Sequence, residues 1–318
     1  MKLVFMETDT LGDDVDLSIF EEFGEVMKYN KSDPEKNWER ASEADILIVN
    51  KIPMNEANLK AAKQLKLICI TATGTNIVDF DYTNKRNIAV ANVKGYSTHS
   101  VVQHTFALLF YVYEKLKFYD DFVKSGEYAK SDIFSRFDMK FNELYQKTWG
   151  IIGLGEIGRG VADVAKAFGC HVIYYSTSGK NKNPDYEQVD LDTLLKTSDI
   201  ISIHAPLNSN TENLIDKDAF AKMKNTAVLL NLGRGPIVNE EALADALENN
   251  RIAAAGLDVL KVEPMLPDSP LLRIKDSNKL IITPHIAWAT VEARKRCVQE
   301  VYENIKAFLK GEERNIVR

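Results

Sequence analysis

At 318 residues the chain is longer than one hydrophobic core usually organises, so two domains are expected. With 45% hydrophobic and 27% charged residues, the composition supplies apolar material for two cores and excludes a largely disordered chain. The net charge of −6 combines both signs without a basic stripe, which argues against a nucleic-acid partner.

The N-terminal run MKLVFMETDTLGDD is a short apolar stretch followed at once by acids, which is typical of a first strand and not of a signal peptide. The longest apolar stretch, 101–113, is interrupted by Gln103 and His104 and is too short to span a bilayer. The cysteines are far apart and match no disulfide or zinc pattern: Cys69, Cys170 and Cys297. We therefore expect a cytoplasmic protein without membrane contact or metal, whose thiols are buried and reduced.

Short β-rich runs alternate with helical patterns from the N-terminus onward. The strands expected in the first hundred residues are Leu3–Met6, Ile46–Val49, Leu67–Thr71 and Ile88–Ala91. A helix is expected over Glu56–Gln64, and one long helical segment over Ser97–Ser125. The stretch that follows, Gly126–Gln146, has no clear periodicity and many aromatic and charged residues, so we interpret it as a functional or interface loop.

The alternation restarts in the second half of the chain. The strands expected there are Thr148–Ile152, His171–Tyr175, Ile200–His204, Ala227–Asn231, Ala253–Asp258 and Leu280–Thr283. A last helical pattern covers Thr290–Leu309. Strands that alternate with helices imply parallel sheets with crossover connections. The layout therefore suggests an α/β protein in which one βα domain interrupts another. We interpret it as two Rossmann-like, doubly wound parallel-sheet domains, with residues 99–288 inserted into a domain made of 1–98 and 289–318, although spacing alone does not show the last helix returning to the first domain.

The sharpest local motif is GIIGLGEIG at residues 150–158, which follows an apolar strand and opens a helix over Ile157–Phe168. This context favours a dinucleotide-binding turn, with an ordinary glycine-rich βα turn as the alternative. Gly153 permits the tight turn, Gly155 lets the backbone approach a pyrophosphate, and Gly158 lets helix and strand pack closely. The helix N-terminus adds free N–H groups and the positive end of a dipole.

Three later stretches place a polar side chain just beyond a predicted strand, where open α/β sheets bind ligands. They are NLGRG at 231–235, GLDV at 256–259 with the following Glu263, and TPHIAW at 283–288. Taken singly, an arginine in a turn or a histidine in a loop is often structural. Together they supply what hydride transfer to a ketone requires: His285 as proton donor, Glu263 to favour its imidazolium, and Arg234 to grip a carboxylate and polarise the carbonyl.

The chain resembles the D-isomer-specific 2-hydroxyacid dehydrogenase family over essentially its whole length. The motifs that carry the resemblance are, in order, GIIGLGEIG at 150–158, HAP at 204–206, NLGRG at 231–235, AGLDVLKVEP at 255–264 and TPHIAW at 283–288. Gly95–Thr98, Gln103–Thr105 and Trp288 make it most similar to the hydroxypyruvate reductase, or glycerate dehydrogenase, group.

The resemblance implies Arg234, Glu263 and His285 as the catalytic triad. It implies that Thr73 and Gly74, within the stretch 71–76, hold the substrate carboxylate through their backbone amides. Trp288 is a candidate wall of the substrate pocket, with a core or interface tryptophan as the alternative. The positions implied for coenzyme binding are Gly153, Leu154, Gly155, Glu156, Ile157, Gly158, Ser176, Thr177, His204, Ala205, Pro206, Thr211, Leu232, Gly233, Asp258 and Val101.

The expected cofactor is NAD(P). Ser176 occupies the place where NAD-preferring sites normally carry an acid, and Lys180 follows, so the sequence slightly favours NADPH over NADH while both are expected to work. The expected reaction is hydride transfer between the nicotinamide and C2 of a small D-2-hydroxy/2-oxo acid, best matched by hydroxypyruvate or glyoxylate. Lactate, branched or aromatic 2-oxo acids, and a dinucleotide-sensing binding protein are the alternatives. The resemblance also implies a homodimer formed through the coenzyme domain.

Overall fold

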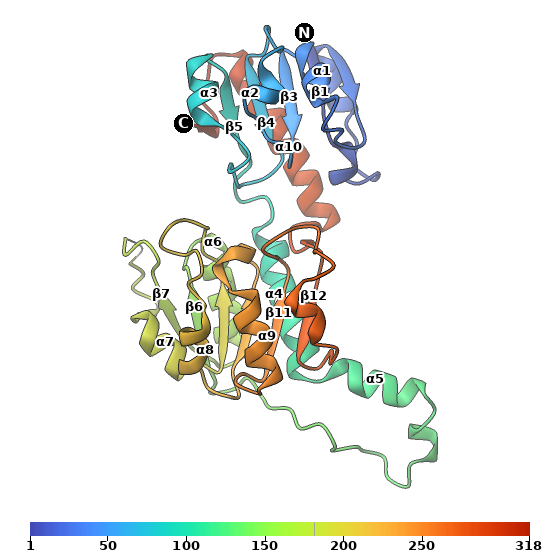
Figure 1. Cartoon of the computed structure of the whole chain (residues 1–318), viewed down its shortest axis with the longest axis vertical. Helices are drawn as coiled ribbons and strands as arrows, with labels where there is room; N and C mark the ends of the chain where they lie inside the picture. Colours follow the sequence, from blue (N-terminus) through green and yellow to red (C-terminus); the bar gives the residue numbers. More distant parts are fainter. Residues whose placement is uncertain (181) are drawn as a thin grey trace. The chain divides into compact units, whose positions relative to one another are not determined.

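A computed structural model describes residues 1–180 and 182–318, which divide into two compact units (Figure 1). The first unit combines Met1–Ser97 with Ala289–Arg318, and the second is Thr98–Trp288. The second unit is thus inserted into the first, which confirms the expected fold class of two parallel-sheet α/β domains.

The first unit is built on a six-stranded sheet in the order β13-β5-β4-β3-β1-β2, parallel throughout except for β13 against β5. Strands β3 and β4 are buried at every residue, as expected where helices cover both faces of a sheet. The elements of this unit are β1 (Lys2–Phe5), η1 (Thr8–Thr10), η2 (Ser18–Phe23), β2 (Glu25–Lys28), α1 (Asn37–Ser42), β3 (Ile46–Val49), α2 (Glu56–Leu59), β4 (Leu67–Ile70), α3 (Phe80–Lys85), β5 (Ala89–Ala91), α10 (Val291–Leu309) and β13 (Ile316–Val317).

The second unit contains a seven-stranded, wholly parallel sheet in the order β12-β11-β10-β9-β6-β7-β8. Its chain starts at β6, runs outward to β8, and then crosses back to β9, so the strand order reverses between β6 and β9. Ligands of open α/β sheets bind at such a switch point, beyond the carboxyl ends of the strands. The elements are α4 (Thr98–Tyr113), α5 (Leu116–Lys124), η3 (Tyr128–Lys130), β6 (Thr148–Ile152), α6 (Glu156–Ala167), β7 (His171–Tyr175), β8 (Glu187–Gln188), α7 (Leu191–Thr197), β9 (Ile200–Ile203), α8 (Lys217–Lys222), β10 (Val228–Asn231), η4 (Gly235–Ile237), α9 (Glu240–Glu248), β11 (Ala254–Leu257), η5 (Pro270–Arg273) and β12 (Leu280–Ile282).

Two hydrophobic cores lie on the two faces of this second sheet. Successive strand residues point to opposite faces, so Ile151 joins the core formed with α4 and α6, whereas Ile152 joins the core formed with α7, α8 and α9. Trp149 is fully buried in the first of these cores, and its indole N–H donates to Ser202 Oγ at 2.9 Å. The sheet is therefore a rigid base on which the loops at its carboxyl edge are mounted.

Side chains that cap the helices define where most of them begin. Asp190, Asp216 and Asn239 accept hydrogen bonds from the first-turn backbone amides of α7, α8 and α9. Thr290 does the same for α10. Such caps satisfy amide groups that have no partner inside the helix. Helix α6 differs, because its N-cap is Gly155 and no side chain caps it.

The long helical segment expected over residues 97–125 is wrong in one respect, because the structure divides it into α4 and α5. The break falls at Lys115, which has a left-handed backbone with a φ of 58°. Lys115 Nζ donates to the carbonyl of Asn278 at 3.2 Å, a contact distant in sequence. No glycine or proline marks this break in the sequence. The helix expected over residues 56–64 is also shorter, since α2 ends at Leu59.

Beyond the break, α5 and the chain up to β6 extend away from the second sheet as an arm, defined here as residues 116–145 (Figure 1). Apart from α5 and η3, this arm contains no regular element in the part of the chain described, as the loss of periodicity after Gly126 predicts. Among the described residues, no helix has the length and apolar character needed to cross a membrane.

Candidate active site

The stretches singled out for chemistry follow three neighbouring parallel strands. Strands β12, β11 and β10 adjoin in that order, and the register aligns their last residues. Because parallel strands that end in register release their chains at one edge, the loops that carry Arg234, Glu263 and His285 leave the second sheet together. The structure therefore brings to one edge the three groups that the sequence predicts to act together.

His285 and Glu263 form a direct pair at this edge. The distance between His285 Nδ1 and Glu263 Oε2 is 2.7 Å, and the side chains are 25% and 30% exposed, respectively. The second oxygen, Oε1, accepts the backbone N–H of Leu260 at 2.9 Å. Both carboxylate oxygens are thus engaged, which fixes the carboxylate against Nδ1 and leaves Nε2 as the ring nitrogen available to a ligand.

The loop that carries His285 is braced by a buried carboxylate. Asp258, 1% exposed, accepts the backbone N–H groups of Ile286 at 2.9 Å and Ala287 at 2.8 Å. It also accepts the hydroxyl of Thr283 at 2.6 Å. His285 itself has a φ of 54°, a left-handed conformation that non-glycine residues rarely adopt. The contacts of Asp258 on both sides of His285 stabilise that unusual backbone.

Arg234 follows β10 in a turn that packs tightly on the loop carrying Glu263. A Cβ atom on Gly235 would lie 1.9 Å from the carbonyl carbon of Leu260, so only glycine permits this approach. The guanidinium donates through Nη1 to the carbonyl of Gly233 at 2.8 Å. Within residues 1–180 and 182–318 it forms no ion pair with a carboxylate. Its charge is thus free to bind a substrate anion.

The turn between β6 and α6 has the geometry of a phosphate cradle. Gly153 has a φ of 93°, and a Cβ there would lie 2.8 Å from the amide nitrogen of Ala205. A Cβ on Gly158 would lie 2.3 Å from the carbonyl oxygen of Gly153. At Gly155 a Cβ would meet no atom within 4 Å, so open space lies before the uncapped end of α6. Free amides facing open space suit an anion such as a pyrophosphate.

Two buried polar groups at the switch point lack partners within the described residues. Ser176 follows β7 and has a buried Oγ without a hydrogen bond. His204 follows β9, and both of its ring nitrogens are buried without a hydrogen bond. Burial lowers the pKa of His204 to about 3. Because buried polar groups normally have partners, the orphaned hydroxyl, the glycine cradle and the uncapped helix together fit a bound dinucleotide.

The other positions implied for coenzyme binding differ in exposure. Leu154, Ala205, Leu232 and Val101 are buried, whereas Glu156 and Pro206 are exposed. Ile157 and Thr177 are half-buried, and Gly233 is buried beside Ala205. Thr211 is fully buried, and its hydroxyl donates to the carbonyl of Pro206 at 2.7 Å. Thr211 therefore shapes the loop after β9 with its hydroxyl already engaged.

The candidate substrate loop lies in the first unit, directly after β4. Thr73 donates through its hydroxyl to the carbonyl of Val93 at 2.8 Å, and its own carbonyl accepts from the side-chain amide of Asn92 at 2.7 Å. These bonds fix the loop on both sides of Gly74 while leaving the Thr73 side chain exposed at the surface of this unit. Trp288 is the last residue of the second unit and is half-buried.

Sequence reasoning gave no role to Thr283 and used His104 only as a motif residue. In the structure His104 Nε2 lies 3.0 Å from Thr283 Oγ1 and 3.6 Å from Asp258 Oδ1. A histidine within the otherwise apolar stretch 101–113 was the available signal. Its partner lies 179 residues away along the chain, so no local pattern could reveal it.

Comparisons with known proteins agree with this geometry. Residues 106–287 match the model of the D-isomer specific 2-hydroxyacid dehydrogenase, NAD binding domain. A hydroxypyruvate reductase of Blautia hydrogenotrophica is 37% identical, covering 100% of this chain and 99% of the relative. A glycerate dehydrogenase of Methylorubrum extorquens is 36% identical over 99% and 98% of the two chains. The solved structure of an acyclic imino acid reductase in complex with NADPH and D-Arg superposes with a TM-score of 0.87, at 31% identity over 100% of both chains.

The fold and the site define a two-domain oxidoreductase that uses a nicotinamide dinucleotide. The chain belongs to the D-isomer-specific 2-hydroxyacid dehydrogenase family. This confirms the resemblance read from the spaced motifs, and with it the enzyme class.

Proposed function

We propose that the enzyme reduces a short 2-oxo acid, with hydroxypyruvate and glyoxylate as its preferred substrates, to the D-2-hydroxy acid. The observation that carries the proposal is the 2.7 Å contact between His285 Nδ1 and Glu263 Oε2 at the same sheet edge as Arg234. The names of two relatives similar over nearly the full length, a hydroxypyruvate reductase and a glycerate dehydrogenase, support the choice of substrate.

In this mechanism side chains of the enzyme bind the substrate anion and supply the proton. The reduced nicotinamide, when bound, supplies the hydride that adds to C2. Glu263 favours the imidazolium of His285, and the proton on Nε2 passes to the substrate oxygen as the carbonyl becomes an alcohol. Arg234 binds the substrate carboxylate and polarises the carbonyl. His285 ends neutral and recovers its proton from solvent after the product leaves.

We assign the remaining substrate contacts to Thr73, Gly74 and Trp288. The backbone amides at Thr73 and Gly74 would bind the substrate carboxylate, since hydrogen bonds on both sides hold the loop after β4. Trp288 would limit the length of the substrate side chain. Its support is its place beside Ala287, whose amide Asp258 holds.

Steady-state kinetics on hydroxypyruvate, glyoxylate, pyruvate, 2-oxoisocaproate and phenylpyruvate tests the proposal. The highest kcat/KM is expected for hydroxypyruvate or glyoxylate. A highest value for pyruvate, a branched or an aromatic acid would replace the proposed substrate with that acid. Binding of the dinucleotide without turnover of any acid would instead support a dinucleotide-sensing protein.

For the cofactor we propose a slight preference for NADPH. The support is Ser176, which stands after β7 with an orphaned hydroxyl where an acid would repel a 2′-phosphate, and the nearby exposed Lys180. Ser176→Asp should shift the ratio of kcat/KM values toward NADH by about tenfold, equivalent to about 1.4 kcal/mol, because the new carboxylate would repel a 2′-phosphate and bind a ribose hydroxyl. Ser178→Asp adds the same charge at an exposed position and is the control. A wild-type preference for NADH of about a hundredfold would refute the proposal.

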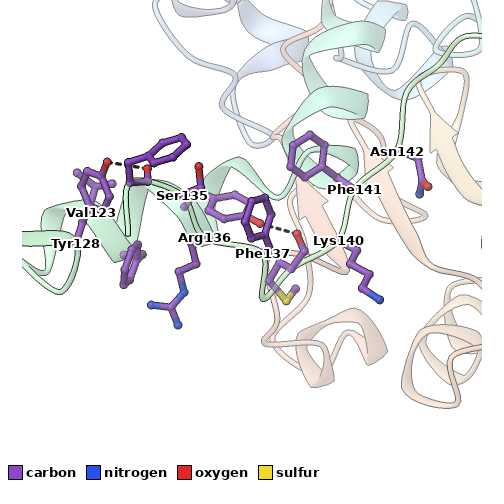
Figure 2. Close-up of a pocket in the computed structure, with 12 residues that line it drawn as sticks. Val123, Tyr128, Ser135, Arg136, Phe137, Lys140, Phe141 and Asn142 are labelled. Carbon is purple, nitrogen blue, oxygen red and sulfur yellow. Dashed lines mark hydrogen bonds between the residues drawn. The ribbon is translucent and has the colours of Figure 1, made fainter. Parts of the chain in front are cut away.

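We also propose that the second unit forms a homodimer through the arm. Its exposed apolar side chains include Phe134 at 89%, Phe137 at 76% and Tyr145 at 63%. Figure 2 shows the part of this face around Arg136 and Phe137. The Arg136 guanidinium carbon lies 3.8 Å from the ring centre of Phe122, and both residues line a hollow of about 910 Å³. Apolar surface of this kind is typical of obligate interfaces.

Size-exclusion chromatography with light scattering tests this interface. The wild type is expected at the mass of a dimer, and Phe134→Asp with Phe137→Asp at the mass of a monomer. A monomeric wild type at micromolar concentration would refute the interface, and a dimer that survives the double substitution would place it elsewhere.

A further inference from the structure

A histidine that the proposed mechanism does not use lies beneath the catalytic loop. His104 belongs to α4, which packs on β10, β11 and β12. Its Nε2 is 3.0 Å from the hydroxyl oxygen of Thr283, which directly follows β12 and precedes His285 by two residues. Helix α4 therefore reaches the catalytic loop at two points, through His104 and through Ser100, whose hydroxyl donates to the carbonyl of Ala287 at 2.5 Å.

The direction of this hydrogen bond follows from the group beyond it. Thr283 Oγ1 lies 2.6 Å from Asp258 Oδ1, and an ionised carboxylate can only accept. The single hydroxyl hydrogen of Thr283 is thus used on Asp258. Thr283 Oγ1 must then accept from His104, which requires a hydrogen on Nε2. Burial lowers the pKa of His104, with Asp258 opposing the shift, which favours a neutral ring, and the contact with Thr283 selects the tautomer with its hydrogen on Nε2.

The carboxylate at the end of this chain holds the backbone on the far side of the catalytic histidine. Asp258 Oδ1 accepts from Ile286 N and Oδ2 from Ala287 N. Thr283 precedes His285 by two residues, and Ile286 follows it directly. The hydrogen-bonded relay from His104 through Thr283 to Asp258 therefore holds the backbone on both sides of His285, whose φ is 54°. A group whose rotamer is fixed by such supports is held in its reactive geometry.

We propose that His104 is a positioning residue for the reaction, which acts through Thr283 and Asp258 to hold His285 in the conformation that places Nδ1 on Glu263. This inference rests on the proposed catalytic role of His285. It assigns to His104, the histidine of the QHT motif at residues 103–105, a function that the coenzyme and substrate contacts leave unexplained. It also makes α4 part of the catalytic apparatus without direct contact with the reacting atoms.

Paired substitutions separate the relay from simple packing. Thr283→Val keeps the shape of threonine and removes the hydroxyl, whereas Thr283→Ser keeps the hydroxyl. His104→Leu removes the donor, and His104→Gln offers an amide N–H in its place. Val112→Ala, on the same helix and fully buried, loosens the packing of α4 without touching the relay.

We expect Thr283→Val to lower kcat by roughly tenfold to a hundredfold, the range for a lost hydrogen bond to a charged group. His104→Leu loses a hydrogen bond between neutral groups and should lower kcat by roughly threefold to tenfold. In both variants KM for the 2-oxo acid should change by less than about threefold. Thr283→Ser and His104→Gln should recover most of kcat. Val112→Ala should lower Tm while kcat stays within about twofold of wild type. Equal losses in Thr283→Val and Thr283→Ser, or a kcat for Thr283→Val within about twofold of wild type, would overturn the proposal.

Amide hydrogen exchange of the cofactor-free protein provides a second readout that does not depend on turnover. Faster exchange over residues 284–288 is expected in Thr283→Val relative to Thr283→Ser, because the amides of Ile286 and Ala287 lose their oriented acceptor. If the exchange rates over residues 284–288 were the same in Thr283→Val and Thr283→Ser, the proposed relay would be refuted even if the enzyme were active. Faster exchange in a protein that turns over no 2-oxo acid would instead support the relay and refute the proposed function.

Discussion

Glu263→Gln isolates the contribution of the Glu263–His285 pair. The carboxylate accepts two hydrogen bonds, from His285 Nδ1 at 2.7 Å and from Leu260 N at 2.9 Å. An amide has one acceptor oxygen, so glutamine can satisfy only one of these donors and no longer balances the imidazolium charge. A hydrogen bond to a charged group contributes about 1.5–3 kcal/mol. Because the two side chains are 25% and 30% exposed, we take the lower end, which corresponds to about a tenfold loss of kcat.

The assay is steady-state reduction of hydroxypyruvate, followed by nicotinamide absorbance, with Glu240→Gln as the control. Glu240, the first residue of α9, accepts the backbone N–H of Lys261 at 2.6 Å through Oε1, so glutamine can keep this contact while removing one negative charge beside the loop that carries Glu263. Glu240→Gln should leave kcat within about twofold of wild type. An equally small effect of Glu263→Gln would refute the reasoning about the pair.

Three further outcomes follow from the site. Burial lowers the pKa of His204 from 6.5 to about 3, so its contribution to the stability of the fold is fully present above pH 6.5 and is lost as the pH falls. In urea titrations of the cofactor-free protein, His204→Leu should therefore reduce the loss of unfolding free energy between about pH 7.5 and pH 5 by about 2 kcal/mol. An unchanged pH dependence in this variant would contradict this reasoning. Trp288→Ala should raise kcat/KM for phenylpyruvate relative to glyoxylate, whereas an unchanged ranking with a lower Tm would favour a packing role. Gly235→Ala should lower both kcat and Tm, because its Cβ would overlap the Leu260 backbone; wild-type values of both would show that the loop adapts.

The fold could be predicted from sequence because its strands are short, apolar and regularly separated by helical patterns. Three of the expected strands, Ile46–Val49, Thr148–Ile152 and His171–Tyr175, match β3, β6 and β7 residue for residue. The break between α4 and α5 could not be predicted, since Lys115 adopts its left-handed backbone in a segment with no glycine or proline. The two-residue edge strands β8 and β13 depend on pairing with β7 and β5, which a local pattern does not encode.

The sequence could predict the three catalytic candidates because each of them follows a predicted strand. Arg234, Glu263 and His285 stand after β10, β11 and β12, and the parallel order of these strands brings their loops to one edge. Sequence reasoning assigned Asp258 to the coenzyme and did not foresee that its carboxylate braces the loop after His285. That role depends on hydrogen bonds between residues 25 to 29 positions apart, whose geometry only the folded sheet defines.

The central claim is that His285 donates the proton that accompanies hydride transfer, and single-turnover kinetics of His285→Ala tests it most directly. With enzyme in excess over hydroxypyruvate and saturating reduced cofactor, the decay of nicotinamide absorbance should slow by about 10²–10⁴, the usual cost of losing a general acid. Cofactor affinity should stay close to that of the wild type, since the phosphate cradle at Gly153–Gly158 is untouched. A decay rate near that of the wild type would show that another group supplies the proton.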